Sequence, residues 1–149
     1  MLFSKACEYA IQVVLLLAVS EKEGYTPVRE IADQSGVPVH YLGKICGELA
    51  QTGVLVSYKG PRGGVALSKP AEDISLLDVV QAVDGNALFE RCVLGLDPCS
   101  HELPCPVHNL WAGARDQIHD MVASKTLKQL GDELLSGTTT LRQALGVSG

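Results

Sequence analysis

Residues 26–68 read TPVREIADQSGVPVHYLGKICGELAQTGVLVSYKGPRGGVALS, and this stretch decides the fold. Thr26 and Pro27 predict a helix start, with threonine as the N-cap and proline in the first turn. A turn containing Gly36 separates this short helix from a second one over about residues 39–52, which Gly53 ends. Apolar residues of the second helix recur at helical spacing, so the pair predicts a helix-turn-helix.

A β-hairpin follows directly, with strands over residues 54–59 and 65–68 and the tip GPRGG between them. A hairpin in this position predicts the wing of a winged-helix domain. Glycines flanking Arg62 let the backbone approach a phosphate while the guanidinium reaches into a narrow minor groove. We therefore expect a reader of double-stranded DNA.

The apolar stripe of the second helix leaves several residues facing outward near its N-terminal half. In a helix-turn-helix, that half lies against base edges in the major groove. The outward residues are His40, Tyr41, Gly43, Lys44 and Gly47.

Outside this stretch the pattern is helical. Residues 4–20 predict a helix buried nearly all round, residues 74–83 predict a second amphipathic helix with Ser75 as a candidate cap, and residues 107–123 predict a long helix. The long helix has an apolar stripe and a solvent-facing side, and such a stripe on so small a domain favours a two-fold homodimer. The predicted solvent-facing residues are Arg115, Asp116, His119 and Asp120.

The expected fold class is mostly α with a small β-hairpin wing: a winged helix-turn-helix with a long dimerisation helix. We divide the chain into a DNA-binding domain (1–84), a cysteine loop (85–106), a dimerisation and closing helix (107–135) and a flexible tail (136–149).

Charge is distributed unevenly over the 149 residues, whose net charge is −5. Residues 1–70 carry seven Lys/Arg against six Asp/Glu, and the remainder carries five against eleven. This balance excludes a general nucleic-acid coat but permits a specific DNA reader. The start lacks the features of a signal peptide, and the apolar run 11–19 is too short to span a bilayer, so we expect a cytoplasmic protein without membrane contact.

Residues 91–108, RCVLGLDPCSHELPCPVH, hold three of the five cysteines, spaced C-x6-C-x5-C, and then a histidine as C-x2-H. Prolines make regular structure improbable through most of this loop. Thiolates and an imidazole together suit zinc or an iron–sulfur cluster, and a spacing longer than C-x2-C favours the cluster. The alternatives are structural zinc, a disulfide or thiol switch, and inert buried cysteines. A different class, an enzyme with a Cys/His nucleophile and base, has no accompanying phosphate loop or paired carboxylates.

The helix-turn-helix, the GPRGG wing tip and three cysteines before a long helix together resemble the Rrf2 family of bacterial winged-helix regulators, over residues 1 to about 135. The resemblance implies that Cys92, Cys99 and Cys105 bind an iron–sulfur cluster. Two positions match alternative fourth ligands of the family: His108, which we favour, and Glu8, which would act from the partner subunit. His108 tilts the cluster type towards [2Fe–2S] over [4Fe–4S].

The resemblance also implies DNA contacts on the recognition helix and the wing. The sequence departs from the iron–sulfur members at Gly43, where they carry a glutamate, and in a first cysteine gap that is one residue longer. These features imply a palindromic operator of different sequence, read by a homodimer that responds to iron–sulfur status, redox state or nitric oxide. The implied DNA-contacting residues are Pro38, His40, Tyr41, Lys44, Lys59 and Arg62.

Overall fold

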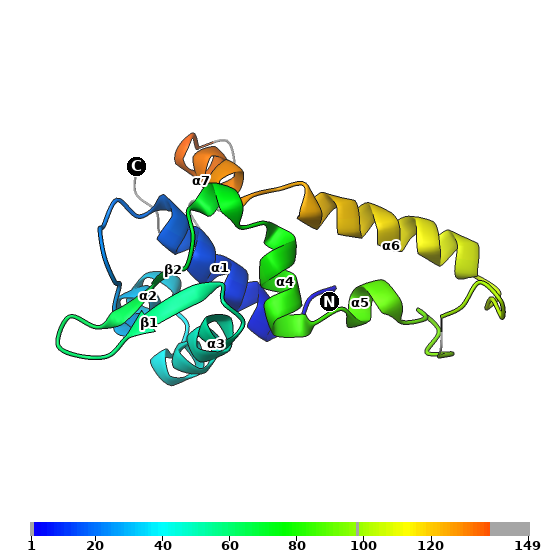
Figure 1. The fold of residues 1–149 in the computed structure, drawn as a ribbon, viewed down its shortest axis with the longest axis horizontal. Coiled ribbons are helices and arrows are strands. Elements are labelled where there is room, and N and C mark those ends of the chain that lie inside the picture. Colours follow the sequence, from blue (N-terminus) through cyan, green and yellow to red (C-terminus); the bar gives the residue numbers. More distant parts are fainter. Residues whose placement is uncertain (1, 98, 138–149) are drawn as a thin grey trace.

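Helix α1 (Lys5–Val19) lies at the centre of the computed structural model, which describes residues 2–97 and 99–137 (Figure 1). It packs against α2, α3, α4, α7 and strand β2. Four successive side chains, from Val13 to Leu16, are all buried, which requires neighbours on every side of the helix. The prediction of a helix buried nearly all round is confirmed.

The start of α1 is attached to the end of another helix. Ser4 caps α1 by accepting a hydrogen bond from the Cys7 backbone N–H at 3.1 Å. The carboxylate of Asp84, the last residue of α4 (Leu76–Asp84), accepts from the Ser4 backbone N–H at 2.9 Å and from its hydroxyl. One carboxylate therefore joins the two helices at the edge of the core.

Helices α2 (Val28–Ser35) and α3 (Val39–Gln51) form the predicted helix-turn-helix, and Gly36 adopts a left-handed φ of 74° between them. The predicted N-cap was wrong: Pro27 occupies that position without a side-chain bond. Thr26 is instead held extended, because its backbone N–H and C=O both pair with Val65 at 2.9 Å.

The wing is an antiparallel hairpin of β1 (Leu55–Tyr58) and β2 (Gly64–Leu67), with Tyr58 opposite Gly64 at its outer end. Leu55 and Val65 enter the core, whereas Tyr58 is exposed and stacks on Tyr25 with ring centroids 5.3 Å apart. The described residues are thus mostly helical with one two-stranded sheet, as the sequence predicted.

Two capping boxes define the remaining core helices. Ser75 and Asp78 cap α4, and Thr126 and Gln129 cap α7 (Leu127–Leu135), which packs on α1. A β-bridge joins the two caps, because Leu76 N–H donates to Lys125 O and Leu127 N–H donates to Ile74 O, both at 2.9 Å. A 3-10 turn, η1 (Ala71–Asp73), precedes α4 and contacts α7.

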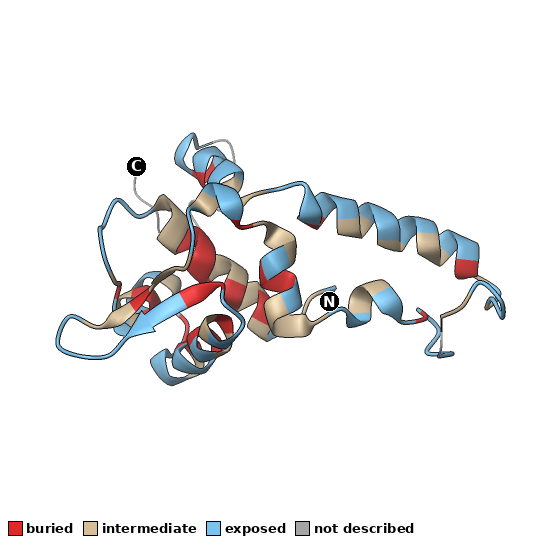
Figure 2. Ribbon diagram, viewed as in Figure 1, coloured by how far each residue is buried: buried red, intermediate tan, exposed pale blue. Residues whose placement is uncertain are grey.

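An arm made of α5 (Ala87–Glu90), the cysteine loop and α6 (His108–Ala123) projects from this core (Figure 1). Most of α6 is exposed or only partly buried, and His108 at its outer end is an exception (Figure 2). No helix among the described residues is long and apolar enough to cross a membrane. The predicted tail lies outside the described residues beyond position 137.

The approach of β2 to Thr26 generates a prediction about stability. A Cβ on Gly64 would overlap the Thr26 carbonyl, whereas a Cβ on Gly43 of α3 meets nothing within 4 Å. We expect Gly64→Ala to lower the free energy of unfolding by about 1–3 kcal/mol, because the backbone pairing must open to admit the methyl group. Gly43→Ala should raise it by about 0.5–1 kcal/mol through the lost glycine entropy. Urea unfolding measures both, and a Gly64→Ala protein as stable as wild type would contradict the packing described.

Candidate functional site

The start of the cysteine loop is held against α6. Asp97 accepts a hydrogen bond from the Cys92 backbone N–H at 3.4 Å and pairs with the Arg91 guanidinium at 3.3 Å. Trp111 of α6 donates its indole N–H to the Arg91 carbonyl at 3.0 Å. These contacts hold the first cysteine beside α6, although it lies 16 residues earlier in the chain.

Cys92 and Cys105 form one pair of thiols. Burial raises the pKa of Cys92, but hydrogen bonds from the backbone N–H groups of Leu96 and Leu94 and from the Cys105 thiol outweigh this, so its pKa is lowered. Burial and the neighbouring Cys92 raise the pKa of Cys105, against the effect of the Val107 N–H. Cys92 is therefore the more acidic thiol of the pair and Cys105 the less acidic one.

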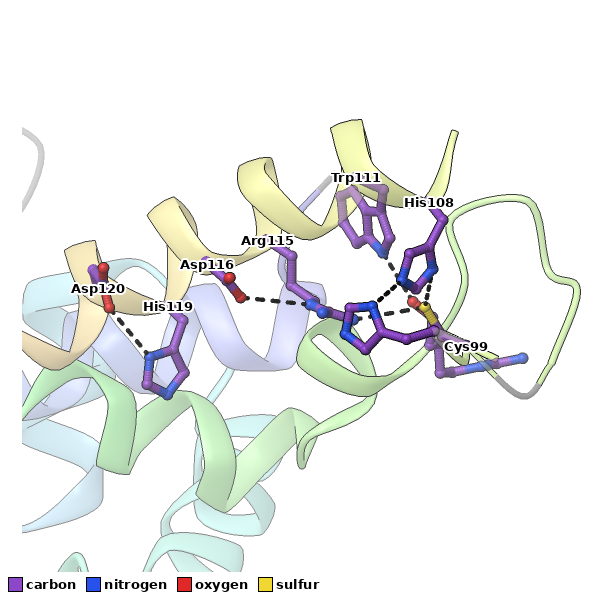
Figure 3. A network of polar contacts seen from close by, with 9 residues as sticks. Cys99, His108, Trp111, Arg115, Asp116, His119 and Asp120 are labelled. Carbon is purple, nitrogen blue, oxygen red and sulfur yellow. Dashed lines mark hydrogen bonds and ion pairs between the residues drawn. The ribbon is translucent and has the colours of Figure 1, made fainter. Parts of the chain in front are cut away.

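Cys99 lies between an imidazole and a guanidinium (Figure 3). Its Sγ is 3.5 Å from His108 Nδ1, and Arg115 donates to the same sulfur at 3.7 Å. The prediction that Arg115 faces solvent was wrong, because its side chain is only 15% exposed. Arg115 lies one helical turn after Trp111 and two turns after His108, on the face of α6 that the loop contacts.

The donor set fits a metal centre in its chemistry. A tetrahedral ion with sulfur at ~2.3 Å and nitrogen at ~2.0–2.1 Å separates two ligand atoms by about 3.5 Å, which is the distance from Cys99 Sγ to His108 Nδ1. Within residues 2–97 and 99–137, however, no three His, Cys, Asp or Glu side chains lie close enough to hold one ion. A shared metal centre therefore requires the Cys92–Cys105 pair and the Cys99–His108 pair to approach each other.

The remaining candidate ligand, Glu8, is half-buried, and the two other cysteines, Cys7 and Cys46, are buried. Glu8, in the first turn of α1, pairs with Lys5 at 3.1 Å. Burial raises the pKa of Cys7 to about 12, with a further contribution from Asp84, and raises that of Cys46 to about 11. These two thiols are protonated packing groups.

The predicted DNA-contacting residues lie on α3 and the wing. Pro38 is the N-cap of α3, and His40 and Lys44 are exposed on the helix. Tyr41 is half-buried, with its ring edge-on to that of Tyr9 at 5.7 Å, so the core covers part of the ring.

A groove of about 480 Å³ separates the open face of α3 from the wing. Its lining includes Gly43 and Gly47 on the helix and Lys59 on the hairpin, and Arg62 is exposed at the wing tip. The glycines keep the helix side of this groove free of bulky side chains, so a phosphate backbone can approach closely.

A helix-turn-helix with a hairpin wing, beside a separate cysteine-bearing arm, defines a winged-helix DNA-binding regulator. The profile of the Rrf2 family, described as an iron-dependent transcriptional regulator, matches residues 3–133. The chain belongs to the Rrf2 family, and the resemblance inferred from the sequence is confirmed.

Individual relatives agree with this assignment. The HTH-type transcriptional regulator IscR of Pectobacterium atrosepticum is 32% identical over 91% of this chain and 80% of that protein. The oxidized form of Staphylococcus aureus CymR is 27% identical, with a TM-score of 0.69, over 87% of this chain and 94% of that one. CymR, the global cysteine regulator of B. subtilis, shares the fold with a TM-score of 0.75 at 23% identity, over 87% and 95%. The chain is a DNA-binding transcriptional regulator, and no relative named here is an enzyme.

Two residues of the site escaped prediction from the sequence. His101 has its Nδ1 3.0 Å from His108 Nε2, and Arg115 contacts Cys99. Arg115 could have been found from its spacing of seven residues after His108, which places both on one face of a helix. Nothing in the sequence around His101 indicates where its ring points.

The contrast between core and loop thiols predicts their reactivity. We expect iodoacetamide at pH about 8 to alkylate the loop cysteine Cys92, whose pKa is lowered, in the metal-free native protein and to spare Cys7 and Cys46, because only thiolates react and burial keeps these two protonated. Their pKa values of about 12 and about 11 imply that Cys7 and Cys46 of the folded protein become labelled only at much higher pH. Mass spectrometry of peptides measures this, and urea-unfolded protein should label at all five. Labelling of Cys46 ahead of the loop in the native protein would contradict the assignment.

Proposed function

We propose that this regulator is a homodimer that binds an iron–sulfur cluster through Cys92, Cys99 and Cys105, with His108 as the fourth ligand. A [2Fe–2S] cluster is favoured over [4Fe–4S], because a histidine completes the ligand set. The dimer reads a palindromic duplex, with one winged-helix domain on each half-site. When bound, the cluster supplies sensitivity to iron supply, oxidants or nitric oxide.

One observation carries the proposal. All three loop cysteines and His108 lie on the arm as two pairs, one of two sulfurs and one of sulfur and imidazole. The Arg115 guanidinium beside Cys99 offsets negative charge that thiolates bring together. The family description, an iron-dependent transcriptional regulator, supports the same chemistry.

The exposed surface of the arm supports the homodimer. Leu110 of α6 is 79% exposed, Leu103 of the loop is 84% exposed and Met121 is 51% exposed. A solvent-facing apolar series on a protruding helix is stabilised when a second copy covers it about a two-fold axis. The arm therefore joins the two DNA-reading domains.

The cluster would act on DNA binding through the order of the loop. Binding of the cluster draws the two donor pairs together and orders the loop against α6. Release of the cluster lets the loop become mobile again. Because α6 belongs to the dimer interface, the state of the loop alters the spacing of the two recognition helices across successive major grooves.

A thiol switch is the second candidate, and one observation favours it. Cys92 and Cys105 are neighbours, and their interaction lowers the pKa of Cys92 and raises the pKa of Cys105. Oxidation by a peroxide would take two electrons from this pair and join the sulfurs as a disulfide. The CymR relative has been solved in an oxidized form, which supports this alternative.

Iron and sulfide analysis of anaerobically purified protein separates the candidates. We expect both elements, with visible absorption, and we expect Cys92→Ser to lose more than about tenfold of each, because a ligand is removed. Cys46→Ala, which changes a cysteine of the core, is the matched control and should keep its cluster. Purified wild type without iron or sulfide would refute the cluster, and zinc in its place would indicate a structural site. His108→Ala should change the spectrum and Glu8→Ala should not.

DNA binding is tested with a palindromic duplex selected in vitro by the wild-type protein. Arg62→Ala should weaken binding roughly tenfold and reduce the slope of log affinity against log salt by about 1, because a cation at the wing tip no longer displaces a counterion. Lys128→Ala, on the exposed side of α7 where the lysine pairs with Asp132 at 2.7 Å, is the control and should bind normally. Unchanged binding by Arg62→Ala would show that the wing does not contact this DNA.

A further inference from the structure

His101 is a histidine outside the ligand set that the sequence predicts. It lies in the cysteine loop, is exposed, and stands edge-on to His108 with ring centroids 4.6 Å apart and an interplanar angle of 85°. Its Nδ1 is 3.0 Å from His108 Nε2, which is hydrogen-bond distance. The two imidazoles are therefore bonded to each other and not merely adjacent.

His108 consequently has both ring nitrogens committed. Nε2 faces His101, and Nδ1 faces Cys99 Sγ at 3.5 Å. The residue is only 4% exposed, so water competes little for either nitrogen. A neutral imidazole carries one N–H, and the bond made by one nitrogen decides which lone pair the other presents.

One sulfur donor, Cys99, lies on the Nδ1 side of His108. Arg115 donates to Cys99 Sγ from α6 and holds that sulfur near Nδ1. A metal centre that uses both Cys99 and His108 must therefore take the Nδ1 lone pair. For that lone pair to be free, the proton must lie on Nε2, where His101 is the acceptor.

We propose that His101 is a positioning residue that fixes His108 as its Nε2–H tautomer and directs Nδ1 toward the cluster. The inference rests on the proposed function, because it assigns a role beside the same His108 ligand. An outer partner of this kind orients the ligand ring and raises its basicity, and losing one typically costs about 10–100-fold in metal affinity. His101 itself contributes no ligand atom.

The tautomer is tested first in the metal-free, reduced protein. Long-range proton–nitrogen correlation spectra are recorded about two pH units above the ordinary histidine pKa of ~6.5, where a neutral imidazole predominates. Wild type and His101→Asn, which keeps an acceptor near the position of Nδ1, should show His108 protonated on Nε2. His101→Phe keeps a ring but removes the acceptor, and it should populate the Nδ1–H form. A His108 ring protonated on Nδ1 in wild type would overturn the proposal.

The second part of the test uses anaerobically reconstituted protein. His101→Phe should retain iron about 10-fold more weakly in a chelator competition and shift the midpoint potential and electron paramagnetic resonance spectrum of the cluster, while His101→Asn stays near wild type. If His108→Ala changes the spectrum and His101→Phe does not, the positioning role fails while the proposed function stands. If wild type assembles no cluster, the proposed function fails, and the tautomer measurement still decides the hydrogen bond.

Discussion

The burial of α1 on all its sides is the constraint on which the rest of the structure depends. A 15-residue helix with four successive buried positions must be covered by several elements at once, and α2, α3, α4, α7 and β2 do so. The recognition helix α3 and helix α4 therefore both pack on α1. The arm begins at the C-terminal end of α4. Neither the DNA-reading face nor the cysteine loop is held by local structure alone.

Much of the fold follows from the sequence, because periodicity and caps are local signals. Apolar spacing located α1, α3, α4 and α6 to within one or two residues, and Ser75 caps α4 as expected. The prediction of Thr26 as an N-cap was wrong because its backbone pairs with β2, which lies far away in the sequence. No local sequence pattern indicates such a pairing. The short elements η1 and α5 escaped prediction, because three or four residues are too few to repeat a helical period.

The candidate site was predictable in its residue types but not in its pairing. The sequence predicts Cys92, Cys99, Cys105 and His108 as donors, whereas a loop interrupted by proline has no repeating geometry from which side-chain directions follow. The contacts of His101 and Arg115 depend on how the loop folds back onto α6. These contacts orient the thiols and imidazoles relative to one another, and only a structure can show them.

Helix α4 is attached to the rest of the molecule at both of its ends. Its first turn shares a β-bridge with the residues that close the arm, and its last residue, Asp84, holds the start of α1. The arm thus leaves the core at one end of α4 and returns at the other. Close-packed interiors rearrange between discrete states more readily than they bend, so a tilt of the arm would have to be accommodated at α4. Because α4 packs against both α6 and the recognition helix α3, such a tilt could reach the DNA-reading face without any contact between the loop and the DNA.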